Sequence, residues 1–138
     1  MGDWYAVGVF AGIGVALGIA AVGAFGGGRV ARAAPLLAAI AGAALGFALG
    51  DIEDAVACGL GAILGGVGTL QLVSGAFRRG ATRIATALLL VVAAIGVAAV
   101  AFIPVAGYLE AIVMPVLGVR MRRRSAERHA GLRTLARD

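Results

Sequence analysis

The sequence has 138 residues, of which 62% are hydrophobic and 14% are charged, and its mean hydropathy is +1.02. Soluble globular domains carry about a quarter charged residues, so this chain has too little polar surface to cover a core in water. The same composition excludes an intrinsically disordered chain. It is typical of an integral membrane protein.

The formal net charge of +5 comes entirely from the last 19 residues. Residues 120–138 hold seven of the 12 basic residues, all of them arginine, and only two of the seven acidic residues. The preceding 119 residues are neutral overall, with five arginines and five acids. We therefore divide the chain into a transmembrane bundle, residues 1–119, and a basic cytoplasmic tail, residues 120–138. The tail explains the high isoelectric point, so we expect no nucleic-acid partner.

Five apolar stretches follow one another along the chain, at residues 4–25, 33–50, 55–77, 84–102 and 104–119. A membrane-spanning helix needs about 20 apolar residues. The first, third and fourth stretches meet this requirement. The second is short, and the fifth is shorter still and contains Pro115.

The arginine positions predict that the fifth stretch also crosses the membrane. Arg29 and Arg32 lie between the first two stretches, and three more arginines lie between the third and the fourth. Only five crossings place these loops and the basic tail on the same side, which the positive-inside rule makes cytoplasmic. We therefore predict an all-α bundle of five transmembrane helices in the plasma membrane, with the N-terminus outside. The alternative has four spanning helices and a re-entrant or interfacial fifth segment.

Residues typical of helix ends lie between these stretches. Asp51 is suited to cap the third helix, with Asp54 in its first turn. Gly80 is suited to end the third helix, and Thr82 to cap the fourth. We expect Pro35 near the start of the second helix, where its missing N–H costs nothing.

Small residues recur at intervals of four in the first three stretches. Residues four apart share one helix face, and a face without side chains lets another backbone approach closely, which favours helix association in lipid. The glycines expected at such contacts are Gly8, Gly12, Gly42, Gly46, Gly61 and Gly65. Two interpretations remain open: contacts within one compact bundle, or contacts between copies in a homo-oligomer or pore.

Glu110 is the only acid inside an apolar stretch. An ionisable group within a membrane is by default a functional hypothesis, so Glu110 is our first candidate for transport. We expect Gly107 to permit the chain reversal before the fifth helix. If that helix begins at Gly107, Glu110 lies instead in its first turn at the outer interface, with Tyr108 as an aromatic anchor.

The third stretch carries three further transport candidates, Thr69, Gln71 and Ser74. They either line a solute path or form hydrogen bonds between helices. Thr69 lies on the same helix face as Gly61 and Gly65, whereas Gln71 lies about 200° around the helix from Thr69. They cannot both face one pore.

Two charged clusters complete the candidates. Arg120, Arg122, Arg123 and Arg124 are expected to contact anionic lipid headgroups, and they also fix the topology. Asp51, Glu53 and Asp54 either bind a divalent cation or simply cap a helix in a solvated turn, and their spacing matches no calcium loop. We predict no metal site and no cofactor.

The sequence contains no set of residues typical of an enzyme. There is one histidine and one cysteine, and the glycines lie in apolar stretches without a phosphate-binding lysine. The first expectation is therefore a non-catalytic structural or accessory component of a membrane assembly. The alternative is a small oligomeric channel or transporter for an ion or small solute, using Glu110 and the polar residues of the third stretch. The depth of Glu110 distinguishes the two, since a deep carboxylate facing other helices favours transport.

Overall fold

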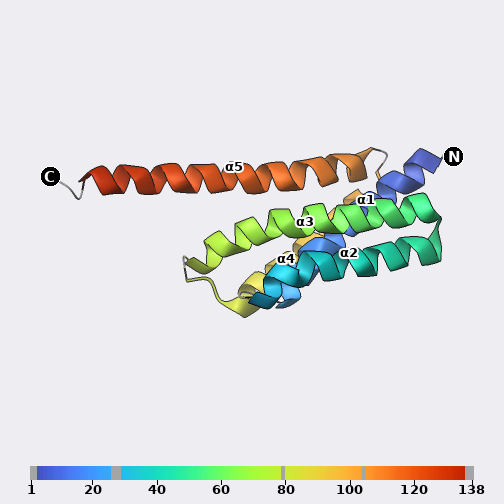
Figure 1. The fold of residues 1–138 in the computed structure, drawn as a ribbon, viewed down its shortest axis with the longest axis horizontal. Helices are drawn as coiled ribbons and strands as arrows, with labels where there is room; N and C mark the ends of the chain where they lie inside the picture. The colour runs from blue at the N-terminus through green and yellow to red at the C-terminus, as the bar shows by residue number, and fades with distance from the viewer. Residues whose placement is uncertain (1–2, 26–28, 79, 104, 136–138) are drawn as a thin grey trace.

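The computed structural model describes residues 3–25, 29–78, 80–103 and 105–135. They form five helices, drawn in Figure 1: α1 (Asp3–Phe25), α2 (Arg29–Leu49), α3 (Ile52–Arg78), α4 (Arg83–Val100) and α5 (Ala106–Leu135). The all-α prediction is confirmed. Four segments are long and apolar enough to cross a membrane: Asp3–Phe25, Val30–Leu49, Ile52–Phe77 and Arg83–Val100.

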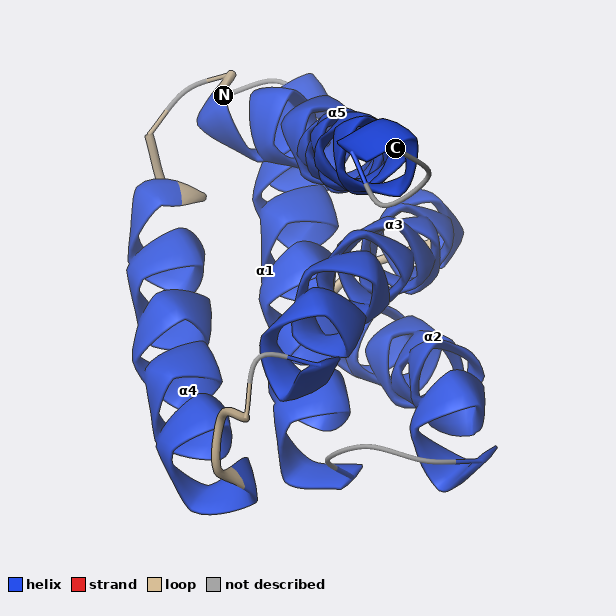
Figure 2. Ribbon diagram, turned by 90° about the vertical axis from the view of Figure 1, so that its left-hand side faces the viewer, coloured by secondary structure: helices blue, strands red, loops and turns tan. Residues whose placement is uncertain are grey.

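Helix α1 is the central element, since all four other helices contact it. The view along the bundle in Figure 2 shows α4 on one side of α1 and α2, α3 and α5 on the other. Helices α1, α3 and α5 run parallel to one another, because residue numbers rise together along their contacts. Helices α2 and α4 run in the opposite direction. The chain therefore changes direction at every connection.

Glycines bring the backbones of α1 and α3 into direct contact. Gly14 and Gly18 face the α3 backbone at Cys58 and Ala62, so that an added methyl group would clash with carbonyl oxygens. From the other side, Gly61 and Gly65 face the α1 backbone near Val15. These contacts lie within one chain. They explain why α1 and α3 form the most extensive helix pair.

Small and β-branched side chains fill the interior around α1. Val15 and Val22 are fully buried, and Ile19 is 2% exposed. Ala94 of α4 packs in one cluster with Val15 and Ile19, whereas Ala34 of α2 packs in another with Val22. Few large side chains are needed, because the glycine contacts leave little space between the helices.

Helix α2 begins earlier than predicted. It starts at Arg29, so Pro35 lies inside the helix and not near its start, contrary to the sequence-based expectation. A proline at this position removes one backbone hydrogen bond of the helix. Its ring packs on Gly66 of α3, where an added Cβ would lie 2.8 Å from the Cβ of Pro35. The missing side chain at Gly66 makes room for the proline.

The predicted helix ends are confirmed at Thr82 and Gly80, and Asp51 lies at the predicted start of α3. Thr82 is the N-cap of α4, and its side chain accepts a hydrogen bond from the backbone N–H of Ala85. Gly80 follows α3 with a φ of +85°, the left-handed conformation that favours glycine. Asp51 immediately precedes α3, and its N–H donates to the carboxylate of Asp54 at 3.2 Å.

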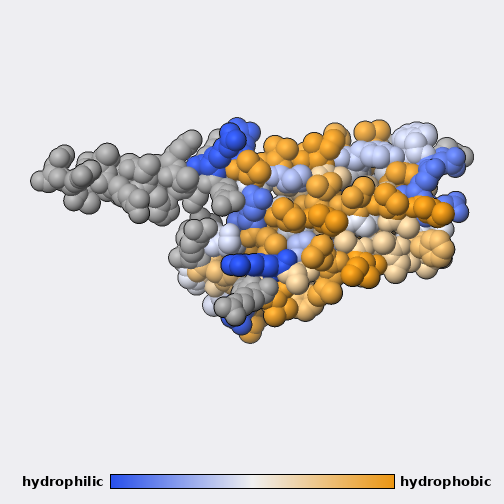
Figure 3. All heavy atoms as spheres, viewed as in Figure 1, coloured by the Kyte–Doolittle hydropathy of each residue, from blue (hydrophilic) through white to orange (hydrophobic). Residues whose placement is uncertain are grey.

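The outer surface of the bundle is apolar along its length. In Figure 3 hydrophobic side chains cover most of the visible bundle, and the strongly hydrophilic described residues gather toward its two ends. Helix α4 contributes most to this surface, since only Ala94 is buried among its residues. A surface of this kind is stable in lipid and not in water. The chain therefore has the architecture of a helical membrane protein.

Candidate functional site

The first half of α5 lies along the bundle, packed against α1 and α3. Gly107 faces the α1 backbone between Gly8 and Gly12, and the ring of Tyr108 covers Gly8. Farther along, Gly68 of α3 faces the carbonyl oxygen of Met114. Helix α5 continues through Pro115, and in Figure 1 its second half extends past the end of the bundle.

These contacts place Glu110 farther from the end of the bundle than its position near the start of α5 suggests. Glu110 is four residues from the start of α5, yet it lies level with Gly12 of α1. Gly12 is nine residues after Asp3, so this level is about 14 Å from the beginning of α1, which is about 34 Å long. Trp4 and Tyr5, which are typical of a membrane interface, lie nearer the end of the bundle.

The carboxylate of Glu110 is turned into the contact between α1 and α5. A Cβ added at Gly12 would lie 2.8 Å from its Oε2 atom and 3.1 Å from the Cα of Gly107. The same Cβ would clash with Ala101, which follows α4. Oε2 is buried and has no hydrogen-bond partner among the described residues. Glu110 lies beyond the first turn of α5, which contains no acid.

The connection between α4 and α5 begins at Ala101, which lies near Gly12 as Glu110 does. The chain reverses at Val105, with a φ of +71°, whereas Gly107 is already helical and packs against α1, so the predicted role of Gly107 in the reversal is wrong. The hydroxyl of Tyr5 donates to the carbonyl of Phe102 at 2.8 Å, and that of Tyr108 donates to the carbonyl of Trp4. These two hydrogen bonds tie the start of α1 to the end of α4 and to the start of α5.

Gln71 of α3 is a second polar residue in contact with α5. Its Oε1 atom is buried without a partner among the described residues, and a Cβ added at Gly118 would lie 3.3 Å from it. Gly118 is eight residues after Glu110, about 12 Å along α5. Glu110 of α5 therefore faces α1, and Gln71 of α3 faces α5 farther along the bundle.

The structure does not bring the other polar residues of α3 to Glu110. Thr69 is fully buried, and its hydroxyl donates to the carbonyl of Gly65 in the same helix at 2.7 Å. Ser74 is exposed, and its hydroxyl donates to the carbonyl of Gln71 at 2.9 Å. The set of four transport candidates is therefore spread along α3 and α5.

The remaining candidates lie at helix contacts and at the end of the bundle. Gly42 faces the carbonyl of Cys58, and Gly46 faces the backbone at Asp54, so both bring α2 close to α3. Arg120 and Arg123 are exposed on α5. The side chains of Arg122 and Arg124 lie outside the described part of the chain.

Glu110 was identified from the sequence, but its surroundings were not. Its neighbours Gly12 and Ala101 are distant in sequence, and no pattern shows the offset at which α5 packs on α1. Comparisons with protein-family models, with curated proteins and with solved structures find no match.

Proposed function

We propose that this chain is a small membrane transport protein, in which the carboxylate of Glu110 binds a proton or a small cation. The observation that carries the proposal is the buried, unpartnered Oε2 atom of Glu110 against Gly12 of α1. An ionised carboxylate without a partner is costly in an apolar environment. A bound proton or cation removes this cost, and its release restores it.

The contacts around Glu110 favour a route along α5. The contact between α1 and α3 is closed by backbone atoms at Gly14, Gly18 and Gly61, which leaves no space for an ion there. Glu110 is instead a residue of α5, and Gln71 of α3 contacts α5 at Gly118, about 12 Å along the helix from Glu110. Pro115 lies between their levels, where it removes one backbone hydrogen bond and weakens the helix. We infer that an ion passes these two groups when α5 shifts against α1 and α3.

The proposal includes five membrane crossings in the plasma membrane. The apolar half of α5 extends from the level of Gly8 to that of Gln71, and Arg120 follows directly. With the chain reversing at each connection, the arginines that begin α2 and α4 lie at the same end as Arg120. The positive-inside rule makes this end cytoplasmic. There we expect the tail arginines to contact anionic lipid headgroups.

Ion flux into proteoliposomes tests the proposal. The native chain is expected to conduct protons or one common cation, and Glu110→Gln is expected to abolish this flux because the amide cannot exchange a proton or balance a cation. Glu127→Gln is the matched control, since it removes one carboxylate that lies 17 residues after Glu110 in the sequence. Absence of flux for protons and for a panel of common ions, with folded native protein, would contradict the proposal.

The second candidate function is a structural or accessory component of a membrane assembly. It is favoured by α4, whose apolar surface is almost entirely uncovered, with Leu88, Leu89 and Val92 each more than half exposed. A partner helix or a second copy could occupy this surface. Native mass spectrometry in lipid nanodiscs distinguishes the candidates, because an accessory role requires a stable complex even in the Glu110→Gln variant.

A further inference from the structure

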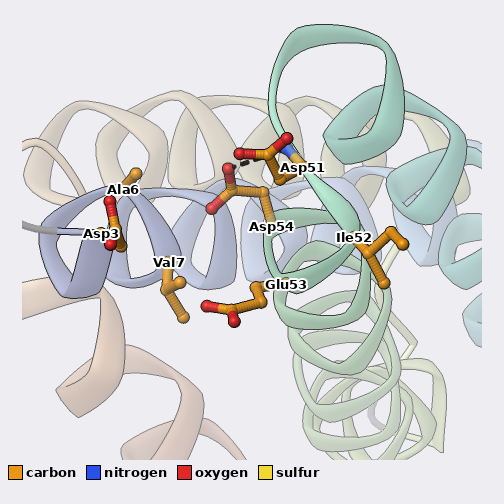
Figure 4. A pocket seen from close by; sticks show the side chains of 7 residues that line it. All are labelled: Asp3, Ala6, Val7, Asp51, Ile52, Glu53 and Asp54. Atoms are coloured by element: carbon orange, nitrogen blue, oxygen red, sulfur yellow. Dashed lines mark hydrogen bonds between the residues drawn. The ribbon is translucent and has the colours of Figure 1, made fainter.

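The starts of α1 and α3 line an open pocket of about 470 Å³ that is separate from Glu110. Four acidic residues line it: Asp3 from α1, and Asp51, Glu53 and Asp54 from the start of α3. In Figure 4 the side chains of Glu53 and Asp54 project from α3 toward the side on which Asp3 and Val7 of α1 lie. Two helices that are distant in sequence therefore bring their acids to one space.

Asp54 is the decisive residue in this pocket. Only 7% of it is exposed, although it carries a carboxylate. One oxygen, Oδ2, accepts the N–H of Asp51 at 3.2 Å, whereas Oδ1 is buried and has no hydrogen-bond partner among the described residues. In Figure 4 the free oxygen points away from Asp51, toward the α1 side of the pocket. The hydrogen bond at the start of α3 therefore occupies only one of the two oxygens of this carboxylate.

No described cation balances these acids. Arginines begin α2 and α4, at the opposite end of the bundle, and the described part of α5 at this end contains none. The dipole at the start of α3 offsets only about half an elementary charge. Four carboxylates around one pocket therefore attract a cation from outside the chain.

The shape of the pocket indicates which cation fits. Among the residues that the structure describes, no three acidic, histidine or cysteine side chains lie close enough together to hold a metal ion. The volume of about 470 Å³ is also far larger than a single ion needs. Ala6, Val7 and Ile52 add apolar wall between the carboxylates. This combination suits an alkyl chain that ends in an ammonium group.

We propose that this pocket binds an organic cation through a primary ammonium group, which donates hydrogen bonds to Asp54 and Glu53. The ammonium group supplies the three donors that the free carboxylate oxygens lack. It belongs either to a soluble amine or to the headgroup of an aminophospholipid at the outer surface. The site uses none of the residues around Glu110, so it stands or fails independently of transport.

Calorimetric titration of the full chain in phosphatidylcholine nanodiscs with 1,4-diaminobutane tests the site. We expect saturable binding that 1,4-butanediol, which has the same length and no charge, does not show. Asp54→Asn is expected to weaken binding by about tenfold or more, since it removes a charged hydrogen-bond acceptor. Glu53→Gln is expected to weaken it as well, and Glu110→Gln to leave it unchanged.

Several outcomes would overturn the proposal. They are absence of saturable diamine binding to folded protein, equal binding of the butanediol, or equal affinity of the native chain and both pocket variants. Glu53 is exposed, so its substitution tests the site even if Asp54→Asn destabilises α3. A repeat in nanodiscs with phosphatidylethanolamine identifies the source of the ammonium group. Weaker apparent diamine affinity there indicates the lipid headgroup, and unchanged affinity indicates a soluble amine.

Discussion

At the scale of single residues, glycines decide how closely the helices approach. At Gly18 an added methyl group would clash with backbone atoms of Ala62 and Gly66, which cannot move without shifting α3. At Gly96 of α4 nothing lies within 4 Å. The two glycines share a helical conformation and differ only in their neighbours. The pair therefore separates the effect of packing from the effect of helix propensity.

We predict that Gly18→Ala destabilises the chain by about 1–3 kcal/mol, because the added methyl group forces α1 away from α3. Gly96→Ala is expected to be neutral or to stabilise by up to about 1 kcal/mol, since alanine is the better helix former. Unfolding in mixed detergent micelles, followed by circular dichroism, measures both changes. Equal stability of the two variants would show that α1 and α3 do not touch through their backbones.

At the scale of helices, the pattern of apolar residues and caps predicts most boundaries. Thr82 begins α4 and Gly80 ends α3 as expected, because capping depends on neighbouring residues only. Pro35 was misplaced because Gly66, more than 30 residues away, determines that its ring fits inside α2. Glu110 is a candidate from the sequence because it is an acid in an apolar stretch. Its distance from the end of the bundle depends on the position along α1 at which α5 begins to pack. Such an offset is a property of packing and leaves no local sequence signal.

The cap of α4 gives a prediction at this scale. We expect Thr82→Ala to destabilise the chain by about 0.5–2 kcal/mol, because the N–H of Ala85 loses its acceptor. Thr82→Ser keeps the hydroxyl and is expected to retain most of the stability. Detergent unfolding compares the three proteins. If the serine variant were as unstable as the alanine variant, the hydrogen bond would not be the cause.

At the scale of the whole molecule, three parallel helices and two opposed ones give the bundle distinct ends. Asp3, Asp51 and Glu53 lie at one end, around a common pocket. Arg32 and Arg83 lie near the starts of α2 and α4, which are at the other end. We propose that this separation of charge orients the bundle in a membrane, with the proposed amine site and the basic tail on opposite sides. Glu110 lies between them, within the apolar part.

The central claim is that α5 crosses the membrane, which places Glu110 inside it. Labelling of single cysteines with a membrane-impermeant maleimide tests this most directly, in a Cys58→Ala background. We predict that Glu53→Cys reacts in intact cells, whereas Arg123→Cys and Arg32→Cys react only after the membrane is opened. Labelling of Glu53→Cys and Arg123→Cys from the same side would show that α5 does not cross. That result would contradict both the five-helix topology and the proposed role of Glu110.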